Sequence, residues 1–200
     1  MRELASQPIR GREFAPAAVV AHGLIGVMIF MGTEVMFFAG LITAFVILRA
    51  GAMAWPPPGQ PRLPLGVSGV NAIVLIVSGF AMYRAVREVR SDRRESAIKW
   101  LIATATLGAT FLAVQGFEWL RLVSYGLTVS SSLYGGIFYT AVGAHGLHVA
   151  GAIVALLFVI RGALAGRYSS RDCHRVEACW LYWSFVVMLW PVLYVLLYLS

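Results

Sequence analysis

The chain has 200 residues, of which 60% are apolar and 12% charged, and its mean hydropathy is +0.78. Soluble domains carry about twice that share of charged residues, so the composition argues against a soluble domain and indicates a membrane protein. Two cysteines are too few for a disulfide framework. The net charge of +7 indicates membrane topology and contact with anionic lipids, and we expect no nucleic-acid partner.

Long windows with few charges follow one another along the chain. They predict helices over about residues 19–48, 67–84, 98–121, 134–161 and 177–199, since one crossing needs about 20 apolar residues. Between the first two windows the proline-rich segment WPPPGQPRLP predicts an extended loop on the outer face. The expected fold is therefore all-α, a polytopic membrane protein with five transmembrane helices bundled in one membrane domain, residues 1–200.

Basic residues are divided unequally between the two sides of this arrangement. Thirteen of the sixteen lie on the side of the N-terminus, and three lie on the other side, namely Arg49, Arg62 and Arg121. Cytoplasmic loops carry the excess of Lys and Arg in membrane proteins. We therefore expect a cytoplasmic N-terminus and a C-terminus outside.

Two carboxylates lie at depth within the predicted helices. Glu34 falls at the middle of the first one, where a bare carboxylate facing lipid is costly, so we expect it to be buried against protein. Two interpretations stay open for it: a proton relay or gate, or a protonated carboxyl group hydrogen-bonded inside the bundle. Gln115, Glu118 and Arg121 share a face of the third helix near its outer end, which favours a partly solvated ion pair between Glu118 and Arg121.

His145 and His148 lie three residues apart in GAHGLHVAG and are candidates for metal or haem ligands. A bis-histidine haem needs histidines on facing helices and a haem-copper centre needs several more, whereas this chain has four histidines in total. We therefore favour interhelical hydrogen bonds, for which Glu34 and Glu118 are the carboxylate partners at depth, and expect no metal and no catalytic residue in this chain. Small residues beside the histidines are predicted to let another helix come close: Gly143, Gly146 and Gly151.

Five motifs occur in register with the five predicted helices. They are MGTEVMFFAG, then WPPPG with Asn71 following, the Gln115 to Glu118 spacing, YGGIFYTAVGAHGLHV, and VEA followed by YW. Together they resemble subunit III of haem-copper cytochrome c oxidase, in its shorter five-helix bacterial form. The resemblance covers about residues 22–199.

The resemblance implies a non-catalytic subunit of the aerobic respiratory chain, in a bacterial inner membrane. It would stabilise oxidase subunit I, share a complex with subunit II and hold phospholipid, while the complex passes electrons to O2 and translocates protons. Haem and copper would lie in the partner subunits. By the same resemblance Glu34 takes the place of the family's buried carboxylate, Arg161 that of an arginine associated with lipid phosphate, and further motif positions with structural or lipid-binding roles are Glu118, His145 and His148.

The fifth predicted helix departs from the family pattern. After Tyr182 and Trp183 the family usually has His-Phe-Val-Asp, whereas this chain has Ser-Phe-Val-Val, with Ser184 and Val187 at the altered positions. This difference keeps open a related subunit that accompanies a nitric oxide reductase. An independent small transporter using Glu34 is a third hypothesis, although the broken helices and paired halves of that class are not evident.

Overall fold

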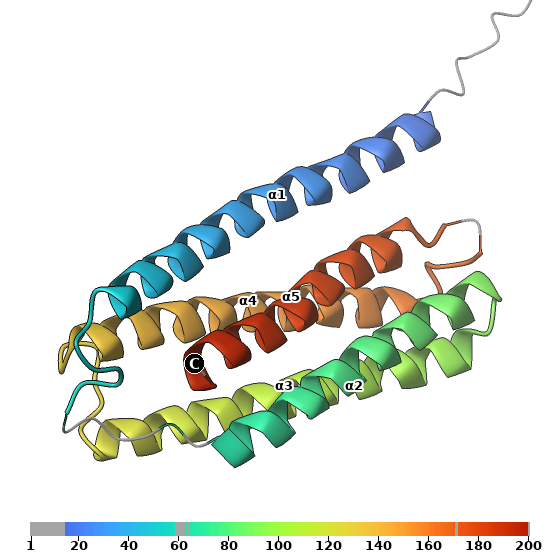
Figure 1. Cartoon of the computed structure of the whole chain (residues 1–200). Coiled ribbons are helices and arrows are strands. Elements are labelled where there is room, and N and C mark those ends of the chain that lie inside the picture. The colour runs from blue at the N-terminus through green and yellow to red at the C-terminus, as the bar shows by residue number, and fades with distance from the viewer. Residues whose placement is uncertain (1–14, 59–62, 64, 171, 200) are drawn as a thin grey trace, which may run out of the picture.

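Five helices make up most of the molecule (Figure 1). The computed structural model describes residues 15–58, 63, 65–170 and 172–199, with side chains described from Ile25 onward. Within that part the helices are α1 (Ala15–Ala50), α2 (Leu65–Arg90), α3 (Arg94–Ser124), α4 (Leu133–Leu164) and α5 (His174–Tyr198). All five are long and apolar enough to cross a membrane, which confirms the predicted fold class.

The helices extend past most of the predicted bounds, by as much as six residues at the end of α2. The predicted bounds stopped where charged residues begin, but charged side chains do not end a helix at the membrane surface. Long Lys and Arg side chains reach the headgroups while their backbone stays helical. Arg87 and Arg90 therefore form the last turn of α2, and Arg94 begins α3.

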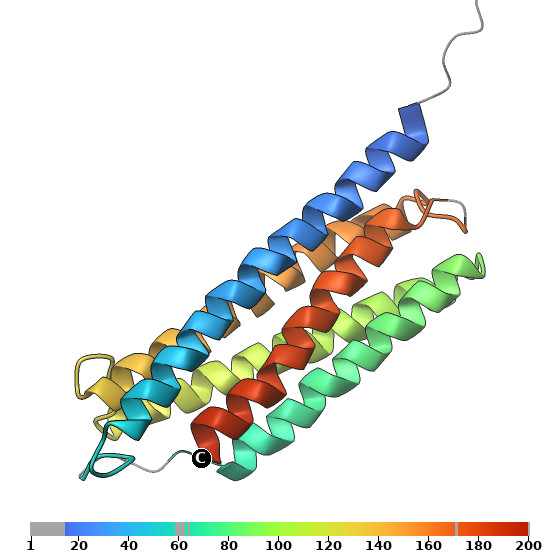
Figure 2. The ribbon, with the colours of Figure 1, turned by 45° about the horizontal axis from the view of Figure 1, so that its top comes forward.

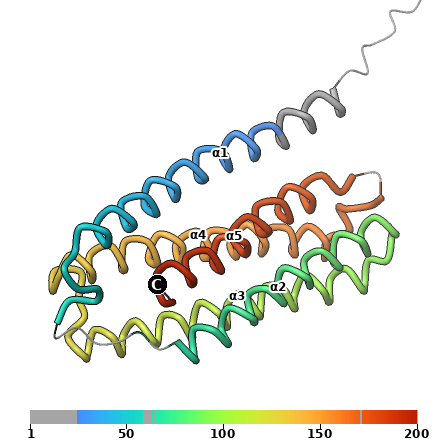
Figure 3. Tube along the Cα trace, in the orientation of Figure 1, coloured from blue at the N-terminus to red at the C-terminus, as the bar shows by residue number. Residues whose placement is uncertain are grey.

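Helices α2 to α5 form a four-helix bundle in which α2 packs on α3 and α5, and α4 packs on the same two helices. Helix α1 lies outside this bundle, against α4 and α5 (Figure 2). Figures 1 and 2 both show α1 diverging from the bundle toward its N-terminal end. The tube in Figure 3 shows the α2–α3 turn and the α4–α5 loop together at one end.

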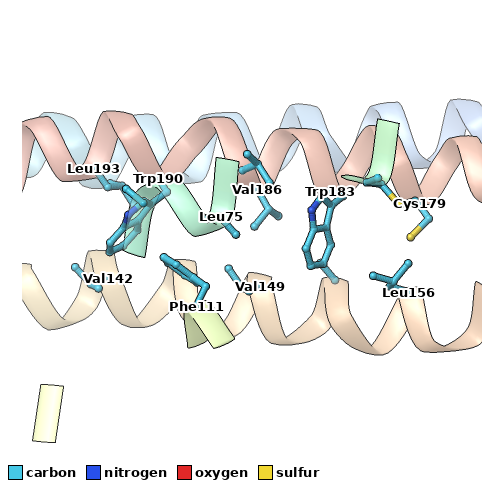
Figure 4. Close-up of a cluster of buried hydrophobic side chains, with 14 of the residues drawn as sticks. Leu75, Phe111, Val142, Val149, Leu156, Cys179, Trp183, Val186, Trp190 and Leu193 are labelled. Carbon is cyan, nitrogen blue, oxygen red and sulfur yellow. The ribbon is translucent and has the colours of Figure 1, made fainter. Parts of the chain in front are cut away.

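Large apolar side chains from α2 to α5 fill the centre of the bundle (Figure 4). Trp183 and Trp190 of α5 are fully buried, Leu75 of α2 and Phe111 of α3 lie beside Trp190, and Leu156 of α4 lies beside Trp183. Lipid tails are as apolar as these side chains, so tight van der Waals packing, rather than escape from water, holds such helices together.

Two helices end in the same way. The backbone N–H of Gly126 bonds the carbonyl of Val123 after α3, and the N–H of Gly166 bonds that of Ala163 after α4. Gly126 has φ +89° and Gly166 φ +69°, a left-handed conformation that glycine adopts without a steric penalty. Each glycine therefore stops its helix at the membrane surface and turns the chain into the next connection.

Close helix packing uses different glycines from the three predicted ones. At Gly146 an added Cβ would lie 2.8 Å from a ring carbon of Trp119, as expected for a close approach, but Gly143 and Gly151 have open space where a Cβ would stand. The predicted close approach is therefore confirmed within the described chain only at Gly146. The sequence did not reveal the close approach of α3 and α5 at Gly108. A Cβ at this glycine would lie 2.5 Å from a ring carbon of Trp183.

Candidate functional site: polar groups at membrane depth

Glu34 on α1 meets His148 on α4, with Glu34 Oε2 and His148 Nε2 2.6 Å apart. The other ring nitrogen, Nδ1, lies 2.6 Å from the carbonyl oxygen of Ala144 on the same helix. A carbonyl oxygen only accepts, so Nδ1 carries a hydrogen and donates it. The contact between Nε2 and the carboxyl group then holds one further proton, on either the nitrogen or the oxygen. In both cases the pair is neutral overall, which suits its depth.

Aromatic rings surround this pair. Phe38 lies edge-on to the ring of His148 at a centroid distance of 5.2 Å, and Phe37 stacks on it at 6.3 Å. The side chains of Glu34 and His148 are 14% and 15% exposed. The carboxyl group thus lies against protein at the α1–α4 contact, and the interhelical hydrogen bond expected for the histidine pair forms at His148.

His145 lies one turn before His148 but points into the four-helix bundle. Its ring is fully buried, stacks on Trp190 at 5.1 Å and lies edge-on to Phe111 at 6.0 Å. Within the described residues neither ring nitrogen of His145 has a hydrogen-bond partner. The prediction of an interhelical hydrogen bond was therefore wrong for His145, because one turn of helix directs it to aromatic side chains instead of a carboxylate.

Glu118 and Arg121 form the expected ion pair on α3, with Arg121 Nη1 3.1 Å from Glu118 Oε1. The glutamate side chain is 5% exposed and the arginine 47%, so the pair joins the bundle interior to its surface. Gln115 takes no part in it. Its amide nitrogen donates to the hydroxyl of Tyr198 at 3.1 Å, and Asn71 of α2 donates to the carbonyl oxygen of Phe111 at 3.0 Å.

Arg161 lies exposed in the last turn of α4, at the end of the molecule that holds the α2–α3 and α4–α5 connections. We call this end the basic end. Its described basic residues are Arg84, Arg87, Arg90, Arg93, Arg94, Lys99, Arg161, Arg167 and Arg175. At the opposite end the described basic residues are Arg49 and Arg121; Arg62 of the proline-rich segment lies outside the described residues.

A set of contacts at the basic end ties the α2–α3 turn to the α4–α5 loop, and we call it the hairpin clamp. Arg90 Nη2 lies 2.8 Å from Glu177 Oε1. The N–H of Ser170 donates to Asp92 at 2.7 Å, and Arg94 Nε donates to the carbonyl oxygen of Ala163 at 3.0 Å. The sequence alone does not reveal these contacts, because they join residues 69 to 87 positions apart.

Side chains that could serve as metal ligands are not grouped in the described residues. In the part of the chain that the structure describes, no three His, Cys, Asp or Glu side chains are placed to hold a metal ion. The two carboxylates at depth are instead each paired, Glu34 with His148 of another helix and Glu118 with Arg121 of its own helix. Five membrane-spanning helices with paired internal polar groups define a polytopic helical membrane protein.

Comparison with known proteins identifies the family within this class. Residues 9–200 match the sequence model of cytochrome c oxidase subunit III. The chain is 41% identical over 177 residues to cytochrome c oxidase subunit 3 of Synechocystis sp., an alignment covering 88% of this chain and 75% of the relative. It is 35% identical over 176 residues to the probable subunit 3 of Nocardia farcinica, and 34% over 177 residues to that of Thermostichus vulcanus, each with 86% of the relative covered. The chain belongs to the cytochrome c oxidase subunit III family, whose members are subunits of an oxidase complex.

Proposed function

We propose that this chain is a non-catalytic subunit that stabilises oxidase subunit I, shares a complex with subunit II and holds phospholipid. Haem and copper then belong to the partner subunits, and the complex carries electrons to O2 and translocates protons. The observation that carries this proposal is the Glu34–His148 pair. The carboxyl group in the middle of α1 is engaged with a histidine of its own fold, which favours a structural use over a carrier site.

The same proposal places the protein in a bacterial inner membrane with the basic end in the cytoplasm. Nine described basic residues at one end against two at the other support this orientation. The N-terminus is then cytoplasmic and the C-terminus outside.

Arg161 is proposed to contact a lipid phosphate. Its guanidinium group is exposed where α4 reaches the membrane surface, and a guanidinium group pairs bidentately with phosphate oxygens. The other basic residues of that end attract anionic headgroups, at roughly 1 kcal/mol for each charge near the surface.

The altered fifth helix does not favour a nitric oxide reductase subunit. Val187 stands where the family usually has an acid, and it is buried. It packs against Gly79 of α2 so closely that a Cβ on this glycine would lie 3.1 Å from a methyl group of Val187. Apolar packing between α2 and α5 thus occupies the position. The relatives named above are cytochrome c oxidase subunits, which supports the oxidase.

The test uses the assembled oxidase. With Glu34→Gln, initial turnover should stay close to that of the wild type, because glutamine keeps a hydrogen bond to His148. With Arg161→Ala, the enzyme should start at the normal rate but lose activity sooner during turnover, with less phospholipid retained after purification. Arg167→Ala, an exposed arginine beyond the end of α4, is the matched control. Complete and immediate loss of turnover in a normally assembled Glu34→Gln enzyme would instead assign Glu34 to proton transfer.

A further inference from the structure

The interior of the α2–α5 bundle contains polar atoms that its own side chains do not satisfy. Among the described residues these include Nδ1 and Nε2 of His145, Nε1 of Trp190 and Oδ1 of Asn71. All three residues are at most 2% exposed. A buried donor or acceptor without a partner costs about 1–3 kcal/mol, so native proteins rarely keep several together.

These atoms belong to one group of contacting residues. The rings of His145 and Trp190 stack at 5.1 Å, and Phe111 lies edge-on to both, at 6.0 Å and 5.1 Å. Asn71 Nδ2 donates to the backbone carbonyl oxygen of Phe111, which places Asn71 beside the same residue of α3. Helices α2, α4 and α5 therefore bring unpaired donors and acceptors to the surroundings of Phe111 on α3.

The chemistry of the group indicates what completes it. A neutral imidazole ring has one N–H donor and one acceptor nitrogen, an indole has one donor, and an amide oxygen accepts. A carboxylate or cation would satisfy only one kind of atom and would bring an uncompensated charge. A small neutral molecule that both donates and accepts matches all of them, and buried water typically makes about three such bonds.

We propose that the bundle binds water internally at His145, hydrogen-bonded to the ring nitrogens and shared with Trp190 Nε1 and Asn71 Oδ1. The ring of His145 thereby becomes a polar centre that joins α4 to α5 and α2 through water. This site is separate from the Glu34–His148 pair, because it lies inside the four-helix bundle and not at the contact with α1.

Two ring exchanges test the site in the purified oxidase complex, with the temperature at which this subunit dissociates as the readout. Trp190→Phe removes an indole N–H with no partner in the described protein, and Trp183→Phe removes one that donates to Ser78 Oγ at 3.2 Å. If water satisfies Trp190, both variants should lower the dissociation temperature by a similar amount, about 2–4 °C. A Trp190→Phe complex as stable as the wild type would overturn the proposal.

The variant His145→Phe should change the dissociation temperature in opposite directions for a hydrated histidine and for a histidine without partners. The variant removes two polar atoms but keeps a stacking ring. A hydrated histidine loses its hydrogen bonds, so the dissociation temperature should fall, whereas a histidine without partners would be replaced at a gain and the temperature would rise. A rise would contradict the proposal.

Direct detection completes the test. In water-edited solid-state NMR of the assembled complex, the ring nitrogens of His145 should receive magnetisation from water, and a structure at a resolution that shows ordered water should place one 2.7–3.2 Å from the ring. Ring nitrogens that face only the aromatic side chains of Phe111 and Trp190 in such a structure would exclude the site.

Discussion

Helix α1 and helix α4 are similar in apolar composition but are held in different ways. Between Ile25 and Ala50, α1 buries two apolar side chains, Phe38 and Phe45, and most of its other residues are exposed. Helix α4 buries residues in nearly every turn and packs on three helices. In a bilayer, apolar composition alone does not distinguish a lipid-facing helix from a packed one. Small residues at contacts and paired polar groups make the difference.

The largest effect is expected from overfilling the bundle. Gly108→Val should clash with Trp183 and cost about 1–3 kcal/mol or more, since the neighbour is a buried ring of α5. Gly40→Ala in α1 is the matched control, because open space surrounds that glycine and alanine favours a helix. Retention of the subunit in the purified complex is the measurement. Equal loss of the subunit from the complex in both variants would show that α1 is packed as tightly as the bundle.

Breaking the Glu34–His148 pair should loosen α1 while the bundle stays intact. Glu34→Leu leaves Nε2 of His148 unpaired at depth, at a cost of about 1–3 kcal/mol. The double variant Glu34→Leu/His148→Leu should recover most of that loss, because neither partner remains unpaired. Spin labels at Met28 of α1 and Phe158 of α4, in a cysteine-free background, should show a broader distance distribution in the single variant only. If the double variant does not recover the lost stability, the pair contributes more than the pairing of its two hydrogen-bonding groups.

The hairpin clamp should matter less. Arg90 is 55% exposed at its side chain, and such surface ion pairs contribute about 0.2–1 kcal/mol. Arg90→Ala should therefore increase hydrogen exchange in the α4–α5 loop without releasing the subunit. Arg87→Ala, an exposed arginine one turn away, is the control. An unchanged exchange rate with Arg90→Ala would show that Asp92 and Arg94 hold the loop by themselves.

The smallest effect concerns Cys173, directly before α5. Burial raises the pKa of this thiol, and a hydrogen bond from its Sγ to Glu177 Oε1 acts in the same direction. A raised pKa means that the folded protein holds the thiol proton more strongly. This stabilisation is present below the usual thiol pKa and is lost as the pH rises through the folded value. The rate of alkylation at Cys173 should therefore increase at higher pH than that of a free thiol. Alkylation of Cys173 with the pH profile of a free thiol would contradict this prediction.

The sequence predicted five crossings because lipid permits few alternatives to an apolar helix. It also placed Glu34 at depth and His148 among its candidate partners, since few polar residues lie within the predicted helices. It did not separate His148 from His145, because the direction of each ring depends on how α4 is rotated against α1 and α5. That rotation is set by contacts of α4 with residues far away in the chain, such as Gly146 with Trp119 of α3. The hairpin clamp depends on similarly distant pairs, such as Arg90 with Glu177.

The Glu34–His148 pair also has a consequence for biosynthesis. The two residues are 114 positions apart, so the ribosome completes α1 well before it reaches His148. At about 5–20 residues per second, the interval is on the order of 10 s. During that time Glu34 lacks His148 as its partner, and its carboxyl group enters the bilayer without it. Docking of α1 is thus a late step, which follows the synthesis of α4 and completes the fold from the outside.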